Sequence, residues 1–570
     1  MPLKVIPNDE TTLTKGERQL LNLLKRLYTD EEESFIYLTP RVNNLEPDFL
    51  LIDRKRGVAV FETKDWTANY LATINQKEIT AIDGKKYYNP SFRTNQYFNT
   101  LQSLFSTDLT LLDDNLELDF NFYAYVVFTS IKSKEIKNRE LFNQYPTKAI
   151  YEDELKKITL NSLFPKGVKE LSNIQISNIR GIVFPEIQLQ NLVHDELSQI
   201  IKTLDIEQES FAKRVPIGHY LVSGVPGSGK TVVLIARAIH LLKEYPDWKI
   251  AIITYNKSLT KKIENRLKEL NGNLYFNDID LLKIEVTTFH SFALKASKIH
   301  VPQDASQSFW EEELAQKALE VIKPSYDAIL VDEYQDFRNS WLKVCIKSLK
   351  KHKDRDNKEQ VNLFMAGDRL QSIYNPTAIN WSKDIGLDMR GRSKIFKQSY
   401  RAGKEHLTFA LKYLMEDKTL KREVEKFYDG SNNIDSKVEL KNSIVFIEGQ
   451  FKEVINHISN LLNSGYIFSD ILILANTWSE AKRFYSYLPP YIKEKSDVLK
   501  DIKDEIINIT TYHSSKGLES RVVILLNIDT IHEKKLLYVG TTRASEKLYI
   551  HSSSFSRGIG KELRRVIQTL

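Results

Sequence analysis

The chain has 570 residues, of which 42% are hydrophobic and 27% are charged, a composition typical of a globular protein with several packed cores. A chain of this length is expected to hold about three or four domains. The formal net charge of +6 is small for the length, so any track for nucleic acid has to come from local clustering of charge. The single cysteine, Cys345, excludes an internal disulfide framework and a cysteine-based zinc site.

The sequence contains no recognisable targeting or membrane segment. Residues 1–20 have no apolar run of the signal-peptide type, and no window is long and apolar enough to span a bilayer. We therefore expect a cytoplasmic protein that has no membrane partner.

The N-terminal region, residues 1–150, begins with a helix and a hairpin. Residues 16–27 are amphipathic at helical spacing, and residues 47–53 and 58–64 read as two strands joined by a tight turn. This order predicts a small α/β domain with a hairpin at its centre.

Two carboxylates and a lysine lie on this hairpin. Asp48 begins its first strand, whereas Glu62 and Lys64 share one face of its second, because side chains two apart in a strand point the same way. Two carboxylates can hold Mg²⁺, which polarises a phosphate and activates water, while the lysine supports the nucleophile or the transition-state charge. The pattern indicates phosphodiester cleavage; the alternative is a solvated strand face that binds no metal.

Residues 1–150 resemble the PD-(D/E)xK nucleases, specifically the nuclease-related (NERD) branch. Asp48, Glu62 and Lys64 match the metal-binding core of that family. Glu17 matches its helical glutamate, and Gln96 lies where the family has a downstream glutamine, although the interval from Pro90 is longer than the family pattern. The resemblance implies a nuclease domain that binds one or two Mg²⁺ ions through Asp48 and Glu62.

Residues 151–204 contain mixed helical segments without recognisable chemistry, and we expect a helical connector. Gln208 follows, a strand's length before a glycine-rich loop. A glutamine at this position can pair both ways with the edge of an adenine, because its amide both donates and accepts.

The glycine-rich loop matches the pattern G-x-x-x-x-G-K-[ST], with a short apolar strand before it and a helical period after it. Glycines let the backbone N–H groups point at phosphates, and the helix N-terminus adds positive potential. The lysine can reach the β- and γ-phosphates of ATP, and the threonine hydroxyl can bind Mg²⁺. The residues predicted to form this site are Gly224, Gly227, Ser228, Gly229, Lys230 and Thr231.

Two adjacent carboxylates end the apolar strand at residues 326–331. Asp332 suits the Mg²⁺ partner of Thr231, and Glu333 suits the base that orients the attacking water. The next strand is followed by Gln371, which is placed to sense the γ-phosphate, and by Tyr374, which can stack on a base.

Two further strands, near residues 250–254 and 286–288, end in aromatic loops. In a parallel α/β sheet, ligands bind at the carboxyl ends of the strands, and aromatic rings there can stack on bases regardless of sequence. The predicted contacts to single-stranded DNA are Tyr255, Phe289, His290 and Tyr374.

Residues 205–570 resemble a superfamily 1 helicase of the UvrD/Rep/PcrA type, with the motifs present in order. The resemblance implies two RecA-like lobes, 205–385 and 386–570, with ATP between them. It also implies that Gln208 reads adenine, Tyr400 stacks on it and Glu519, beside Gly517, holds the ribose. The side chains that would surround the γ-phosphate are Gln371, Arg401 and Arg543.

The chain departs from the helicase pattern in several places. Val232 stands where an arginine is expected, and the aromatic expected shortly after Tyr374 is missing. Both inserted subdomains of larger relatives are reduced or absent, which argues against robust unaided unwinding.

The fold class predicted from the sequence is therefore α/β, with a PD-(D/E)xK-type nuclease domain followed by two RecA-like parallel-sheet lobes. We expect an ATP-dependent DNA translocase or helicase, 3′→5′ by analogy, coupled to a Mg²⁺-dependent DNA nuclease. The layout resembles bacterial nuclease–helicase immunity proteins that restrict bacteriophage. The alternatives are a DNA-repair helicase and an ATP-gated DNA-binding sensor whose N-terminal domain does not cut.

Overall fold

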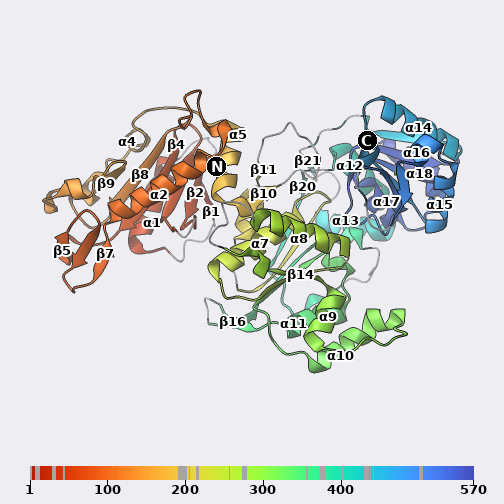
Figure 1. Cartoon of the computed structure of the whole chain (residues 1–570), viewed down its shortest axis with the longest axis horizontal. Helices are drawn as coiled ribbons and strands as arrows, with labels where there is room; N and C mark the ends of the chain where they lie inside the picture. Colours follow the sequence, from red (N-terminus) through yellow and green to blue (C-terminus); the bar gives the residue numbers. More distant parts are fainter. Residues whose placement is uncertain are drawn as a thin grey trace. The chain divides into compact units, whose positions relative to one another are not determined.

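The chain divides into two compact units, which we describe separately in a computed structural model (Figure 1). Unit 1 comprises Met1–Asn191, Asp195–Pro216 and Lys268–Leu281, and unit 2 comprises Leu192–His194, Ile217–Leu267 and Leu282–Leu570. The structure describes residues 3–569 except 7–12, 29–33, 43–44, 190–201, 204–205, 214–216, 256, 272–278, 355–356, 373–378, 401, 429–434, 437, 439, 441, 500–502 and 504.

Unit 1 is built on a mixed sheet with the strand order β1-β2-β3-β4-β8-β9. The pairs β2–β3 and β3–β4 are antiparallel, and the other neighbours are parallel. Gly57 allows the turn between β3 and β4, since its φ is +117° and a Cβ there would lie 2.1 Å from the carbonyl oxygen of Asn121. The strands are β1 (Leu3–Ile6), β2 (Ser34–Leu38), β3 (Phe49–Asp53), β4 (Gly57–Lys64), β8 (Phe122–Phe128) and β9 (Thr147–Ile150).

Two helices pack on this sheet. Helix α1 (Lys15–Leu27) begins with a capping box of Thr14 and Glu17 and buries Leu20, Leu21 and Leu24 against alternate residues of β3 and β4. Helix α2 (Pro90–Phe105) packs along β4 and β8. A three-stranded antiparallel sheet lies between β4 and α2 in the sequence, formed by β5 (Leu71–Ile74), β6 (Glu78–Ala81) and β7 (Lys86–Tyr88).

Apart from residues 192–194, the predicted connector, residues 151–204, belongs to unit 1. It contains helices, as expected, and a short antiparallel pair of strands that the sequence did not suggest. The elements of this region are α3 (Glu152–Leu155), α4 (Leu160–Leu163), α5 (Asn173–Val183), β10 (Gln188–Leu189), β11 (Lys202–Thr203) and α6 (Ile206–Ala212).

A buried ion network ties α5 and α6 to the sheet of unit 1. The Arg180 guanidinium lies 2.6 Å from the Glu209 carboxylate and donates to the Tyr37 hydroxyl at 2.9 Å. Lys213 forms a second ion pair with Glu209, at 2.8 Å. Because Glu209 is fully buried, its charge depends on these partners.

The first sheet of unit 2 is wholly parallel, with the order β14-β13-β15-β18-β12-β19. Its edge strand β19 pairs with β12, so this lobe continues past the boundary at residue 385 that the sequence analysis placed. A short strand of mixed polarity carries no periodic signal that would assign it to either sheet. The strands are β12 (His219–Gly224), β13 (Ile250–Thr254), β14 (Glu285–Thr288), β15 (Ala328–Asp332), β18 (Leu363–Gly367) and β19 (Ser393–Phe396).

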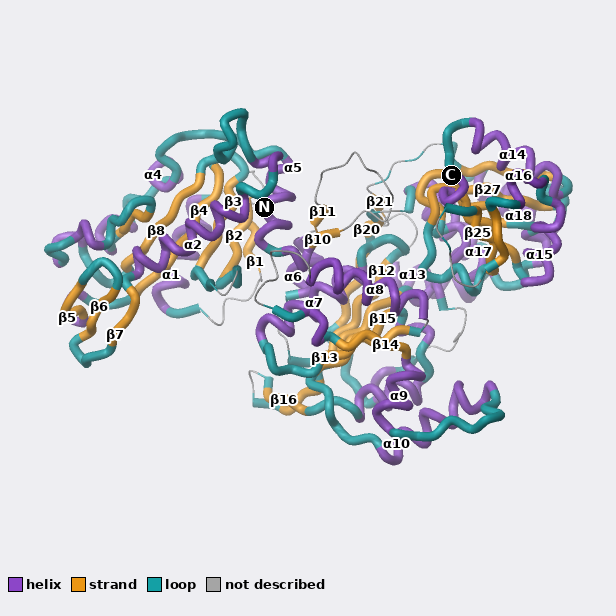
Figure 2. Tube along the Cα trace, viewed as in Figure 1, coloured by secondary structure: helices purple, strands orange, loops and turns teal. Residues whose placement is uncertain are grey.

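Helices cover both faces of this sheet, which Figure 2 shows as a central layer of strands. The core includes Cys345, which is fully buried as expected. A small hairpin of β16 (Lys351–Lys353) and β17 (Glu359–Val361) is appended. The helices are α7 (Lys230–Glu244), α8 (Lys257–Asn271), α9 (Phe289–Ser297), α10 (Leu314–Val321) and α11 (Asn339–Lys347).

The second sheet of unit 2 is also wholly parallel, with the order β22-β27-β26-β23-β25-β24. The predicted class of two parallel-sheet lobes is therefore confirmed. The strands are β22 (Ile444–Glu448), β23 (Ile471–Ala475), β24 (Ser496–Val498), β25 (Ile507–Thr511), β26 (Ser520–Leu525) and β27 (Ala544–Ser552).

Helices surround this second sheet. Two short strands that precede it in the chain, β20 (Gln398–Ser399) and β21 (Asp435–Ser436), pair with each other in parallel. Among the described residues, no helix is long and apolar enough to cross a bilayer. The helices are α12 (Lys404–Met415), α13 (Lys418–Tyr428), α14 (Phe451–Asn463), α15 (Trp478–Tyr487), α16 (Pro490–Lys493), α17 (Lys534–Thr541) and α18 (Gly558–Ile567).

The ion network of unit 1 predicts a large effect on stability. Replacing Arg180 with methionine removes one partner of the buried Glu209, and we expect unit 1 to lose about 3 kcal/mol, since Lys213 still pairs with that carboxylate. Urea unfolding followed by circular dichroism measures the change. Lys85→Met is the control, because the Lys85–Asp83 pair is exposed; equal midpoints for the two variants would contradict the prediction.

Candidate functional site

The glycine-rich loop joins β12 to α7 and has the backbone that phosphate binding requires. Gly227 and Gly229 have φ values of +74° and +77°, in the left-handed region that favours glycine. A Cβ on Gly224 would lie 2.6 Å from the Ser228 hydroxyl. The Lys230 ammonium donates to the carbonyls of Gly224 and Val225, each at 3.0 Å, so it lies over the loop.

Thr231 and Asp332 are brought together from α7 and β15. The Thr231 hydroxyl donates to the Asp332 carboxylate at 2.8 Å, and the other Asp332 oxygen accepts the backbone N–H of Glu333 at 2.9 Å. Burial, with the neighbouring Glu333 charge, raises the pKa of Asp332 to about 7. A hydroxyl and a carboxylate oxygen are the hard donors that Mg²⁺ prefers, so this pair fits the metal predicted for it.

Glu333 has an unusual backbone. Its φ of +54° places a non-glycine residue in the left-handed region, a conformation that costs free energy and is found at active sites. The Gln335 amide donates to its carboxylate. Although burial opposes ionisation, the charges of Lys516 and Lys230 hold the pKa of Glu333 below its usual value, so the carboxylate is ionised.

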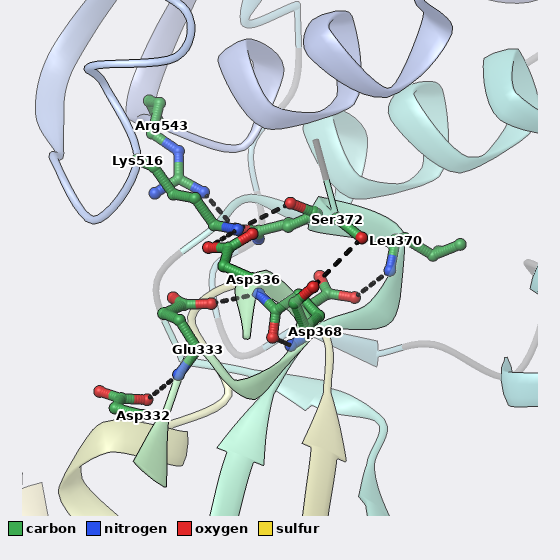
Figure 3. A network of polar contacts seen from close by, with 10 residues as sticks. Asp332, Glu333, Asp336, Asp368, Leu370, Ser372, Lys516 and Arg543 are labelled. Atoms are coloured by element: carbon green, nitrogen blue, oxygen red, sulfur yellow. Dashed lines mark hydrogen bonds and ion pairs between the residues drawn. The ribbon is translucent and has the colours of Figure 1, made fainter. Parts of the chain in front are cut away.

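Residues from the second sheet reach this site (Figure 3). The Lys516 ammonium lies 2.6 Å from the Asp336 carboxylate and donates to the Gln371 carbonyl at 2.8 Å, while the Arg543 guanidinium donates to the Gln371 side-chain oxygen at 2.9 Å. Lys516 and Asp336 are both buried. The structure thus brings Gln371 and Arg543 together, and it adds the Lys516–Asp336 pair, which sequence reasoning missed.

The remaining residues predicted for the nucleotide are distributed as follows. The backbone N–H of Tyr400 donates to the Gly227 carbonyl at 2.9 Å, which places that residue at the loop. Glu519 lies 3.8 Å from the Lys262 ammonium, and Gly517 has a φ of +82°. Gln208 is buried in α6 of unit 1.

Two predicted residues, Arg401 and Tyr374, lie outside the described residues.

The residues predicted to contact DNA form an aromatic cluster around Trp341, which the sequence analysis did not single out. Tyr255 and His290 are half-buried, with ring centroids 6.1 Å and 4.9 Å from that of Trp341. Phe289 is fully buried and stacks on Trp341 at 4.4 Å. A buried ring offers no face to a base, so the burial of Phe289 counts against its predicted contact with DNA, which stays a prediction.

Phe289 follows the largely half-buried strand β14 and packs inward as the first residue of α9, whereas the ring of its neighbour His290 packs edge-on against Trp310. Alternation between a core-facing and a half-exposed aromatic in consecutive positions cannot be read from residue type alone. Trp341 would have been recognisable only from its place on the buried stripe of α11.

The hairpin of unit 1 brings the nuclease candidates together. The Lys64 ammonium lies 2.6 Å from one Glu62 oxygen, and the other Glu62 oxygen is buried without a hydrogen bond from any described residue. The Asp48 carboxylate accepts the backbone N–H of Thr63, beside Glu62. Burial, with the Glu62 charge, raises the pKa of Asp48 to about 7. Two close carboxylates, one with an unused buried oxygen, fit a divalent cation.

Of the helical residues expected near the hairpin site, Glu17 lies at the start of α1 and Gln96 lies on α2. Glu17 is engaged in the capping box of α1, with its carboxylate 2.8 Å from the Thr14 N–H, and its charge contributes to the raised pKa of Asp48. Gln96 is exposed on α2. Arg93 and Tyr97, which sequence reasoning missed, are hydrogen-bonded to each other at 3.0 Å, and the Tyr97 hydroxyl donates to the Glu46 carbonyl at 3.2 Å.

An i, i+4 pair of arginine and tyrosine is the sequence signal that could have identified Arg93 and Tyr97.

Across the described ranges, no group of three or more histidine, cysteine, aspartate or glutamate side chains gathers as a metal site. Any cation at the hairpin would therefore rest on Asp48 and Glu62, with other ligands from backbone, water or substrate.

Comparison with known proteins locates three domain families along the chain. Residues 12–129 match the nuclease-related domain, residues 204–313 and 299–376 match the UvrD/REP helicase N-terminal domain, and residues 507–551 match the UvrD-like helicase C-terminal domain. The matched segments include the hairpin site, the glycine-rich loop with Asp332, and the connections beside β25 and β27 that carry Lys516 and Arg543.

Individual relatives are more distant. A protein described as a probable DNA helicase II homolog from Mycoplasma pneumoniae is 29% identical over 156 residues, and the match covers 22% of this chain and 22% of that relative. The structure of the PRRSV helicase aligns over 61% of this chain and 54% of its own, with 13% identity and a TM-score of 0.29.

An arterivirus nonstructural protein 10 helicase, solved in complex with DNA, aligns over 65% of this chain and 68% of its own, with 16% identity and a TM-score of 0.31. The family matches include the sites described above. The chain therefore combines an N-terminal nuclease-related domain with the N- and C-terminal domains of a UvrD/REP-like helicase.

Proposed function

We propose that the chain is an ATP-driven DNA translocase or helicase joined to a Mg²⁺-dependent DNA nuclease. The observation that carries the motor is the meeting of Thr231 and Asp332 at 2.8 Å, with Lys230 over the glycine-rich loop and Glu333 next in the chain. A P-loop lysine, two hard oxygen donors and an adjacent ionised carboxylate are the parts that phosphoryl transfer to water needs.

Each part has a proposed role. Lys230 binds the β- and γ-phosphates, Thr231 and Asp332 hold Mg²⁺, and Glu333 orients the attacking water. Gln371, Arg401 and Arg543 stabilise charge on the γ-phosphoryl group. Gln208 and Tyr400 recognise adenine, and Glu519 holds the ribose.

DNA is the proposed track, in single-stranded form. Tyr255 and His290 are half-exposed at the carboxyl ends of β13 and β14 and can stack on bases, together with Tyr374. Phe289 supports them from the core. Contacts to the DNA backbone predict that binding falls steeply with salt, and stacking predicts a weak base preference. By analogy with the UvrD class, translocation is proposed to run 3′→5′.

The nuclease site is proposed at the hairpin of unit 1. Asp48 and Glu62 would hold Mg²⁺, which supplies the Lewis acid for phosphodiester hydrolysis, and Lys64 would support the nucleophile or neutralise charge on the phosphate. The support is the buried, unused oxygen of Glu62 beside Lys64.

Lys230→Ala should abolish ATP hydrolysis. We expect DNA-stimulated ATPase activity to fall by about 10²–10³-fold, because the variant loses the cation that binds the transferred phosphoryl group. Lys64→Ala is the matched control and should keep wild-type ATPase activity. Steady-state phosphate release with and without a single-stranded oligonucleotide measures both, and an active Lys230→Ala would refute the motor assignment.

Lys64→Ala should abolish DNA cutting. We expect a loss of about 10²-fold or more in the cleavage rate of labelled DNA, because the charge that supports the phosphate is gone. Lys77→Ala, at an exposed lysine of the same unit, should cut like wild type. Chelation of Mg²⁺ should stop cutting by wild type, and comparison with and without ATP shows whether the motor controls the nuclease.

A second candidate keeps the motor but makes unit 1 a non-cutting DNA-binding module, so that the protein is an ATP-gated sensor. The favouring observation is that the described side chains include no acidic or histidine group of three that could hold a metal. Wild type that hydrolyses ATP in response to DNA but cuts no substrate with Mg²⁺ would select this candidate.

We further propose that the cellular role is restriction of bacteriophage, on the architectural analogy of a nuclease and a helicase in one bacterial-type chain. Cells that express the chain should plate phage less efficiently, and both Lys230→Ala and Lys64→Ala should restore plating. Unchanged plating together with increased sensitivity of a deletion strain to DNA damage would instead indicate a repair helicase.

A further inference from the structure

Gln335 joins the catalytic carboxylate of the motor to a neighbouring strand. Its side chain is fully buried; its amide nitrogen donates to Glu333, and its amide oxygen accepts the Asp368 N–H at 3.1 Å. Gly367 leaves room for this amide, since a Cβ at that position would lie 2.0 Å from the Gln335 oxygen. Figure 3 shows two of the residues joined in this way, Glu333 and Asp368, at the ends of first-lobe strands.

Asp368 continues the connection into the second lobe. One of its carboxylate oxygens accepts the hydroxyl of Tyr538 at 3.0 Å, and the other accepts the Leu370 N–H at 3.0 Å. Tyr538 is fully buried in α17, the helix that ends just before Arg543. An unbroken hydrogen-bond chain therefore runs from a helix of the second lobe to the carboxylate of Glu333.

The chain of hydrogen bonds matters because Glu333 is not held by ordinary backbone geometry. Its left-handed φ of +54° has to be maintained by surrounding contacts, and its carboxylate direction is set by the Gln335 amide. A group that orients an attacking water loses much of its effect when its own direction is free.

We propose that Tyr538, Asp368 and Gln335 act as positioning residues through which the second lobe sets the orientation of Glu333 for ATP hydrolysis. The inference rests on the proposed ATPase function. It adds a second way in which the position of the second lobe can affect ATP hydrolysis, through the orientation of the Glu333 carboxylate. This effect is separate from that of the arginines proposed to lie at the γ-phosphate.

The hydrogen bond between Tyr538 and Asp368 can be removed while other contacts keep the two lobes together. Lys516 and Asp336 form a second, buried link between the same two sheets, and the arginine–glutamine contact forms a third. Removing the Tyr538 hydroxyl leaves both in place and keeps the buried ring. The change therefore acts on the hydrogen-bond chain rather than on the packing of α17.

The test compares four purified full-length variants with wild type: Tyr538→Phe, Gln335→Met, their double variant, and Tyr413→Phe. The last is the control, because Tyr413 is a buried tyrosine of the same lobe, on α12, which packs against α17. The readouts are kcat and KM for ATP at saturating single-stranded oligonucleotide, with thermal melting to verify folding.

Tyr538→Phe and Gln335→Met should each lower kcat by about tenfold, the scale expected for one orienting hydrogen bond, with KM for ATP unchanged. The double variant should be no slower than Gln335→Met, because the two changes break the same chain. Tyr413→Phe should match wild type. If Gln335→Met does not fold, Gln335→Glu replaces it, since that variant keeps the acceptor for Asp368 but loses the donor to Glu333.

An active wild type whose Tyr538→Phe variant matches Tyr413→Phe would overturn this inference and leave the proposed function standing. Independent, multiplicative losses in the double variant would also overturn it. Wild type without DNA-stimulated ATP hydrolysis would overturn the proposed function itself, and this inference with it.

Discussion

A buried charge has to be paired, and this constraint decides how the two parallel sheets of unit 2 meet. Lys516 and Asp336 come from different sheets, and each is almost wholly withdrawn from water, so neither can leave the other without a large desolvation penalty. The pair lies beside the carbonyl of Gln371, whose side chain contacts Arg543. This pair is one of three polar links around the predicted γ-phosphate position, beside the contact of Arg543 with Gln371 and that of Tyr538 with Asp368.

The same constraint shapes the hairpin of unit 1 in a different way. There a lysine and a glutamate two residues apart on one strand neutralise each other locally, and a second carboxylate is held by a backbone N–H of the neighbouring strand. Burial raises the pKa of that second carboxylate, Asp48, so a nearby positive charge would stabilise its ionised form. Either a bound cation or a proton on Asp48 would relieve the cost of the buried charge. Only a bound cation would support phosphodiester cleavage.

Much of the fold and of the nucleotide site could be predicted because the relevant signals are local. Gly227, Gly229 and Lys230 lie in one short motif whose backbone requirements exclude most other residues. The hairpin that carries Glu62 and Lys64 follows from the period of two along a strand. Asp332 and Glu333 were recognisable because polar residues directly after a buried parallel strand lie at the ligand-binding edge.

The features that could not be predicted depend on contacts between distant segments. No local pattern pairs Lys516 with Asp336 across 180 positions, or aims Gln335 at Glu333. Phe289 illustrates the same limit, since residue type alone does not say whether an aromatic after a strand faces solvent or core. Arg93 and Tyr97 were missed because the family pattern directed attention to Gln96, which lies three residues after Arg93 and next to Tyr97 on the same helix.

The ion network around Glu209 bears on how such a protein can be assembled in evolution. Glu209 is the neighbour of Gln208, yet two of its partners, the Arg180 guanidinium of α5 and the Tyr37 hydroxyl on β2, lie in the part of unit 1 that ends at residue 191. A gene fusion that exchanged residues 1–191 for another domain would remove both partners and leave Glu209 with the counter-charge of Lys213, four residues further along the chain. A new partner domain would therefore have to supply a second cation, or leave this buried carboxylate with one ion pair in place of two.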